Sequence, residues 1–289
     1  MKRAMKIAVT SASGNLGSAV INQLKQELDA RDIIGIARTA ENAKHLGVEV
    51  RKGDYNVQAD FNLALKDVDA VLLVSGMDHP DKRIEQHRNV IEAAKNTAVK
   101  KIVYTSIIGA EKGNAFSAIV ASNRQTEEDI RQSGLQWAIG RNGIYIEPDL
   151  EYIEIYKQEG AIINCAADGK CAYTSRQELA FAYTRLLMND ELQGKTYNLC
   201  GVPITQQELA DAINLGFNTK LTFKNIPVDA YILQRQTALG EFLGTIIGGI
   251  YEGIRNGAND VASDFLTISK RPHKSVNEMI KEFKLSNQS

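Results

Sequence analysis

The strongest constraint on the fold is an alternation of short apolar runs with stretches of helical periodicity. Residues 6–10 form a β-branched run, apolar positions recur at helix spacing through 16–28, and residues 33–37 are apolar again. The alternation continues with expected strands at 48–51, 70–74, 101–106 and 136–139 and expected helices at 61–65 and 84–94. Near-continuous apolar strands separated by helices are typical of a parallel sheet covered on both faces. We therefore predict an α/β fold, a Rossmann-type doubly wound parallel sheet.

The pattern becomes irregular beyond residue 139. Three Ser or Thr residues, each followed three positions later by Glu, predict capped helix starts: Ser175 with Glu178, Thr205 with Glu208 and Ser275 with Glu278. Short strand-like pieces lie between them at 196–200 and 220–224. We predict a nucleotide-binding domain over residues 1–145. A smaller C-terminal α/β substrate lobe is expected over 146–289, partly interleaved with that domain.

A glycine-containing loop separates the first expected strand from the first expected helix. It consists of Thr10, Ser11, Ala12, Ser13, Gly14, Asn15, Leu16 and Gly17. Glycine at such a turn lets backbone amides approach a pyrophosphate at the positive helix N-terminus, and Gly17 allows close packing of helix on sheet. The alternative is a simple tight turn. The position between a strand and a helix favours a dinucleotide site.

Arg38 follows directly on the expected strand at 33–37. Rossmann proteins that prefer NAD place Asp or Glu here to bind the ribose 2′-hydroxyl, whereas an arginine accepts a 2′-phosphate. No acidic residue occurs before Glu41. An exposed arginine at a strand end is otherwise common, but with the loop it predicts that NADP(H) is preferred over NAD(H).

Composition excludes several classes of function. Among 289 residues the formal net charge is −1, which leaves no basic excess for nucleic acid. Three cysteines without a paired spacing argue against a disulfide framework or a zinc site, so we expect buried thiols and no metal. No apolar stretch reaches the roughly 20 residues of a membrane span. Residues 1–4 are partly basic, but no small-residue cleavage site follows, so we expect a cytoplasmic protein without membrane association.

Several motifs together carry a family resemblance. They are Val9 to Gly17, Gly53-Asp54-Tyr55, Gln86-His87-Arg88-Asn89-Val90, Tyr104-Thr105-Ser106, Arg141-Asn142-Gly143, Asp168-Gly169-Lys170 and Gly194 to Tyr197. Over nearly its whole length the chain resembles the NmrA-like atypical short-chain dehydrogenases. Within them it is most similar to the NADPH-dependent quinone oxidoreductase and triphenylmethane reductase group.

The resemblance implies a set of binding residues. Thr10, Ser11, Ser13, Gly14, Asn15 and Leu16 would hold the pyrophosphate, Arg38 the 2′-phosphate, Asp54 and Tyr55 the adenine side, and Val74, Ser75 and Gly76 the middle of the cofactor. Thr105, Ser106, Asn142, Gly143 and Tyr145 would border the nicotinamide and the substrate. The chain departs from the family pattern at Ser11, where glycine is usual, at Asn42, where a lysine is frequent, and at Asn123, where a histidine is common. The catalytic residue is therefore unknown.

Catalysis by a Tyr-x-x-x-Lys pair is disfavoured, because no tyrosine has a lysine four positions on. Hydride transfer to a quinone or similar conjugated acceptor needs no such pair, since the acceptor is already electrophilic and water can supply the proton. We therefore expect an NADPH-dependent reductase of a small-molecule electron acceptor. The alternative is a non-catalytic NADP(H)-binding redox sensor with a protein partner. A sugar-nucleotide epimerase ranks third, on fold analogy.

Other side chains receive simpler interpretations. His87 is expected to pack or cap, and Glu127, Glu128 and Asp129 are expected on a solvated helix face. Tyr145, Tyr152 and Tyr156 are expected in the core or stacked on a planar acceptor. Apolar positions from Leu243 to Ile254 at helix spacing predict either a packed helix or a mobile lid or oligomer face, and a homodimer is compatible with the sequence.

Overall fold

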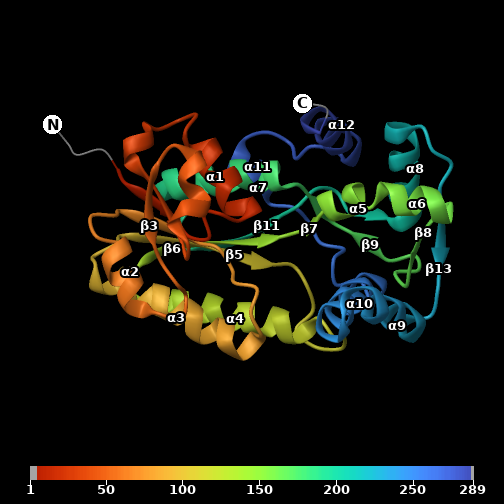
Figure 1. The fold of residues 1–289 in the computed structure, drawn as a ribbon, viewed down its shortest axis with the longest axis horizontal. Helices are drawn as coiled ribbons and strands as arrows, with labels where there is room; N and C mark the ends of the chain where they lie inside the picture. Colours follow the sequence, from red (N-terminus) through yellow and green to blue (C-terminus); the bar gives the residue numbers. More distant parts are fainter. Residues whose placement is uncertain (1–4, 288–289) are drawn as a thin grey trace.

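A parallel sheet of seven strands forms the centre of the computed structural model, which describes residues 5–287 (Figure 1). Met1 to Ala4, considered above for a signal peptide, lie outside the described residues. Across the sheet the strands are β3 (Glu49–Lys52), β2 (Ile33–Ala37), β1 (Ile7–Val9), β4 (Ala70–Leu73), β5 (Lys101–Ile107), β6 (Gln136–Asn142) and β11 (Lys195–Leu199). The strand order reverses at β1, which pairs with β2 on one side and β4 on the other. The predicted doubly wound sheet is confirmed.

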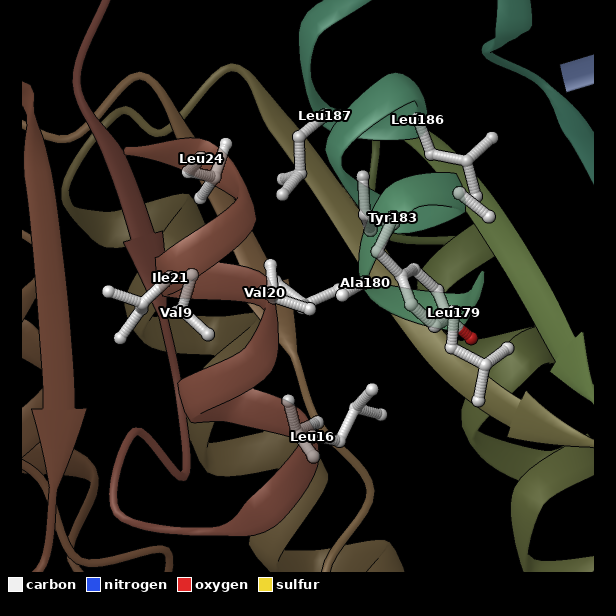
Figure 2. Packing of buried hydrophobic residues seen from close by; sticks show 14 of the residues in the cluster. Val9, Leu16, Val20, Ile21, Leu24, Leu179, Ala180, Tyr183, Leu186 and Leu187 are labelled. Carbon is white, nitrogen blue, oxygen red and sulfur yellow. The ribbon is translucent and has the colours of Figure 1, made fainter. Parts of the chain in front are cut away.

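Helices cover both faces of this sheet (Figure 1). One face carries α1 (Asn15–Leu24), α7 (Arg176–Met188) and α11 (Phe265–Ser269), and the other carries α2 (Gln58–Ala64), α3 (Pro80–Asn96) and α4 (Ser117–Arg131). Figure 2 shows the apolar side of α1 turned toward α7. Val20, Leu24 and Leu187 have no exposed surface there, and burying each such side chain contributes about 1.5–3 kcal/mol. This packing fixes the start of α1 relative to the sheet.

A second group of elements lies beyond one end of the sheet (Figure 1). Its helices are α5 (Glu147–Glu151), α6 (Ile153–Glu159), α8 (Gln206–Phe217), α9 (Val228–Leu239), α10 (Glu241–Arg255) and α12 (Val276–Ser286). Its short strands are β7 (Ile144–Tyr145), β8 (Ala161–Asn164), β9 (Lys170–Cys171), β10 (Tyr173–Thr174), β12 (Ile204–Thr205) and β13 (Thr222–Asn225). The second group of elements has its own apolar core, which includes Tyr173, Ile213 and Ile254.

Three 3₁₀ helices lie in segments that connect elements of the main sheet and its helices. They are η1 (Ala30–Asp32), η2 (Ala40–Leu46) and η3 (Asp190–Leu192).

The chain returns to the main sheet after entering this second group. Helix α7 packs against α1, and β11 extends the sheet beyond β6, with Tyr197 opposite Gly140. The strand expected at 196–200 is thus the outermost strand of the main sheet. The division into residues 1–145 and 146–289 remains a prediction about domains, and α7 and β11 are where the two ranges interleave.

Two of the three expected capping boxes are complete. At Thr205 and Ser275 the side chain accepts a bond from the third helical N–H, and the Glu carboxylate at that position accepts one from the backbone N–H of the cap residue. Ser175 accepts its bond from Glu178 N–H. The Glu178 carboxylate instead accepts bonds of 2.6 and 2.8 Å from Arg271 and a 3.0 Å bond from the backbone N–H of Lys274.

The apolar segment near residue 250 forms α10, which packs closely on α9. A Cβ at Gly244 would lie 2.3 Å from the Gln236 nitrogen, and one at Gly248 would lie 2.4 Å from the Ile232 side chain. Glycines therefore permit this approach. Among the apolar positions, Ile254 is buried, Ile250 is half-buried and Leu243 is exposed, so the packed helix and the lid or oligomer face both stay predictions. Across residues 5–287, no helix combines the length and apolar character needed to cross a membrane.

Candidate nucleotide and acceptor site

The loop after β1 leads into a helix whose first amides lack a capping side chain. Gly14 is the N-cap of α1 and supplies no side-chain bond, so the N–H groups of the first turn have no intrahelical partner. Ser13, Gly14 and Asn15 are exposed at this turn. Partial positive charge at a helix start favours an anion such as a pyrophosphate. The geometry fits the phosphate site that the sequence predicts.

Close packing of α1 on this loop depends on Gly17. A Cβ at that position would lie 2.3 Å from the carbonyl oxygen of Ser11. Ser11 itself has a φ of +51°, in the left-handed region where glycine is favoured. Serine therefore adopts here a backbone conformation that glycine adopts more readily.

Tyr55 ties this loop to the neighbouring strand. Its hydroxyl lies 2.6 Å from Thr10 Oγ1 and 3.1 Å from Ser11 Oγ, and it donates a 2.6 Å bond to the Val74 carbonyl. Val74 N–H in turn donates to Thr10 Oγ1 at 2.9 Å. Burial raises the pKa of Tyr55 to about 12, so the hydroxyl stays protonated. The structure places this hydroxyl at the junction of β1 and β4, between the loop and the strand end.

The end of β2 presents a free cation. Arg38 is exposed, and within residues 5–287 its side chain has no hydrogen bond or ion pair. Asp54 forms no ion pair with it within the described residues, and Asp54 Oδ1 instead accepts 2.9 Å bonds from the backbone and side chain of Asn56. Lys52, at the end of β3, is paired with Asp60 at 3.2 Å. Arg38 is therefore available for a ligand phosphate.

The segment after β4 is held on all sides by side chains. Ser75 N–H donates to Thr105 Oγ1 at 2.8 Å, and Gly76 N–H donates to His87 Nε2 at 3.0 Å. His87 Nδ1 lies 2.9 Å from Thr126 Oγ1. Burial, with a smaller effect from the nearby Arg83 charge, lowers the pKa of His87 to about 3, so the ring is neutral and accepts at Nε2. His87 packs, as the sequence predicts.

Thr105, Ser106 and Asn142 end the next two strands, and their side chains are already engaged. Ser106 Oγ donates to Glu127 at 2.6 Å. Asn142 Oδ1 accepts from Tyr183 at 2.5 Å, and its amide nitrogen donates to Tyr145 at 3.2 Å. Burial raises the pKa of Tyr145 to about 12. These bonds hold the Ser106, Asn142 and Tyr145 side chains in place.

Gly143 completes this edge because backbone crosses it closely. A Cβ there would lie 2.3 Å from the Ala172 carbonyl oxygen. The candidate residues all lie at or directly after the carboxyl ends of β1, β4, β5 and β6: Thr10–Leu16, Val74–Gly76, Thr105–Ser106 and 142–145. These ends share one edge of a parallel sheet, the edge at which open α/β folds bind ligands.

Glu127 corrects the sequence interpretation of α4. Glu128 is exposed on that helix, but Glu127 has no exposed surface and contacts three arginines. Arg141 binds its two oxygens at 2.9 and 2.7 Å. The expectation of a solvated face is therefore wrong for Glu127. The available clue was its helical phase, since it falls in register with the buried Val120 and Ile130.

Arg83 and Asn123 lie behind the segment after β4 and were not predicted as site residues. Arg83 donates 2.6 Å bonds to Ser75 Oγ and to Asn123 Oδ1, and Tyr104 donates to the same oxygen at 3.0 Å. Arg83 falls in phase with His87, Val90 and Ala94 on the buried side of α3. A charged residue in phase with apolar ones was the signal for it.

Two further observations concern metals and thiols. In the described part of the chain, no three His, Cys, Asp or Glu side chains gather in a way that could hold a metal ion. Cys165, Cys171 and Cys200 are free and buried, which confirms the expectation of buried thiols.

These features define a Rossmann-type dinucleotide-binding protein. A family model described as NAD(P)H-binding matches residues 11–189, and the chain belongs to that family. The chain is 34% identical over 224 residues to quinone oxidoreductase 2 of Escherichia coli (strain K12). The matched region covers 76% of this chain and 77% of that protein. The NmrA-like resemblance is confirmed.

Solved structures agree over nearly the full length. The NADPH-dependent quinone oxidoreductase of Escherichia coli complexed with NADPH matches with a TM-score of 0.88 and 29% identity, covering 96% of this chain and 99% of that one. The Citrobacter sp. triphenylmethane reductase complexed with NADP(H) matches with a TM-score of 0.88 and 31% identity, with the same coverage. The relatives are thus NAD(P)H-dependent reductases acting on small molecules.

Proposed function

We propose that this protein is an NADPH-dependent reductase that transfers hydride to a quinone or a similar conjugated acceptor. The observation that carries the proposal is the pair formed by an uncapped α1 and an unengaged Arg38 at one sheet edge. Reductases with 34% sequence identity and with a TM-score of 0.88 support it. NADPH would supply the hydride when bound.

The residues present fit this cofactor. Ser13, Gly14, Asn15 and Leu16 present backbone at the helix start, and Arg38 offers a planar guanidinium to a 2′-phosphate. The segment 74–76 is fixed by Thr105, His87 and Tyr55, so it would meet the middle of the cofactor without reorganising. Thr10, Ser11 and Asp54 shape these surfaces through their own bonds.

Chemistry at the nicotinamide end would depend on position. Thr105, Ser106, Asn142, Gly143 and Tyr145 border this end of the sheet edge, with their polar groups already bonded. A quinone accepts a hydride at one carbonyl system and a proton from water at oxygen, giving a hydroquinone. The protein need only hold two rings together and exclude side reactions.

The Tyr145 environment disfavours the epimerase alternative. Alcohol oxidation requires a tyrosine whose pKa is lowered, whereas burial raises the pKa of Tyr145 to about 12. The redox-sensor alternative shares the cofactor site but has no turnover.

Steady-state NADPH oxidation with a panel of quinones, alongside direct NADPH titration, tests the proposal. We expect tight NADPH binding and acceptor-dependent oxidation that is much slower with NADH. Tight binding without turnover on any quinone would favour the sensor. Failure to bind either nucleotide would contradict the whole proposal.

A further inference from the structure

Arg83, near the start of α3, is a buried cation without a buried anion. Its side chain is only 4% exposed, and Nε has no hydrogen-bond partner. Nη2 donates to two neutral oxygens, on Ser75 and Asn123, at 2.6 Å each. No carboxylate within residues 5–287 forms an ion pair with it. Arginine nevertheless stays protonated, and an unpaired buried charge is costly to retain.

The surroundings of Arg83 contain neutral polar groups. Tyr104 donates to Asn123, and the pKa of Tyr104 is raised to about 12 by burial. His87 is neutral, because burial and then the Arg83 charge itself lower its pKa to about 3. The bonded network behind the segment after β4 therefore carries one net positive charge.

By the topology of the sheet, this charge would lie near one half of a bound dinucleotide. A Rossmann fold binds its ligand across the point where strand order reverses, with the adenine half at the β2 end. The other half extends toward the ends of β4 and β5, where Ser75 and Tyr104 connect to Arg83. That half holds the nicotinamide ring, which gains a positive charge when the cofactor is oxidised.

We propose that Arg83 is a positioning residue that sets the redox preference of cofactor binding, with NADPH bound more tightly than NADP⁺. This inference rests on the proposed function. The buried charge acts through Ser75 and Asn123 to hold the segment after β4, and it repels the cationic ring of the oxidised cofactor. Weak retention of NADP⁺ would help the product leave after each turnover.

The redox preference separates this role from a structural one. If Arg83 only holds the segment, its loss weakens NADPH and NADP⁺ alike. If its charge discriminates, the ratio of the NADP⁺ and NADPH dissociation constants falls, and each tenfold change corresponds to about 30 mV in the potential of the bound couple. The effect should persist in high salt, because buried charges are screened little.

The test is direct titration of NADPH and NADP⁺ against the wild type, Arg83→Gln and Asn123→Asp. Arg83→Gln removes the charge, and Asn123→Asp neutralises it in place, because the new carboxylate would lie against Nη2. We expect each variant to lower the ratio of dissociation constants at least about threefold, in low and high salt. Asn123→Asp keeps the test decisive if Arg83→Gln does not fold.

The matched control is Arg88→Gln, on the same helix. Arg88 is exposed and paired with Asp129 at 2.7 Å, so its loss should leave the ratio unchanged. An unchanged ratio in the folded Arg83 and Asn123 variants, with both nucleotides still bound, would overturn this inference and leave the proposed function intact. A wild type that binds neither nucleotide would overturn the proposed function itself.

Discussion

The two ends of the candidate site differ in how their charges are held. At the end of β2, Arg38 is exposed and unengaged. At the ends of β4 and β5, Arg83 and Glu127 are buried and bonded to neighbours. An exposed charge can gain a ligand contact without losing a protein contact, whereas a buried charge shapes the site from behind. Substitutions at the first end should change affinity, and those at the second should first change stability.

The largest expected effect is that of Glu127→Gln on stability. Removing one member of a buried charge cluster typically costs about 3–5 kcal/mol, and Glu127 contacts Arg124, Arg131 and Arg141. Urea unfolding at pH 7 measures the change. Glu128→Gln, an exposed neighbour, is the control and should have little effect.

The loss of stability in Glu127→Gln should depend on pH. Burial raises the pKa of Glu127, but hydrogen bonds from Arg141 and Ser106 and the charge of Arg124 outweigh it and hold the pKa below its usual value of 4.5. A group with a lowered folded pKa contributes stability above its unfolded pKa and loses it as pH falls further. The gap in unfolding free energy between wild type and Glu127→Gln should therefore narrow below about pH 4.5. A gap independent of pH would contradict an ionised Glu127.

Arg38→Ala should have the next largest effect, on affinity and not on stability. A charge-assisted contact to phosphate contributes roughly 1.5–3 kcal/mol, so NADPH binding should weaken about ten- to a hundredfold while NADH binding hardly changes. Titration of both nucleotides measures this. Lys44→Ala, which removes an exposed lysine paired with Glu41, is the control. Unaltered discrimination in Arg38→Ala would show that the 2′-phosphate binds elsewhere.

Tyr55→Phe should have the smallest effect, and it should lower both the stability of the protein and its affinity for NADPH. The ring would still stack on Phe61, but the Thr10, Ser11 and Val74 bonds would be lost. We expect a loss of about 1–2 kcal/mol in stability, because the Val74 carbonyl loses a donor, together with a few-fold weaker NADPH binding. Thermal unfolding and titration measure the two.

The control for Tyr55→Phe is Tyr197→Phe, at the outer strand β11. It removes one buried bond to the Leu192 carbonyl, at 3.0 Å, so stability should fall without any change in NADPH affinity. Equal effects on affinity in both variants would indicate that Tyr55 has no special place in the loop.

The sequence by itself determined the parallel sheet, the loop before α1 and the exposed Arg38. These features depend on residues within a few positions of one another: hydrophobic period, a glycine turn and the first residue after a strand. The complete capping boxes at Thr205 and Ser275 are equally local. NADP(H) as the cofactor followed from the same short segments and from the family resemblance.

Only the tertiary structure decided which charges are buried and what they bind. The sequence pattern predicts a solvated face for Glu127, but in the folded structure Arg141, from β6, binds its carboxylate. The Glu178 carboxylate does not complete its capping box and instead binds Arg271, 93 positions away. Arg83, on α3, donates a hydrogen bond to Asn123, on α4. Such pairs depend on how distant elements pack, and burial decides whether a charge must find a partner, so no local pattern in the sequence could specify them.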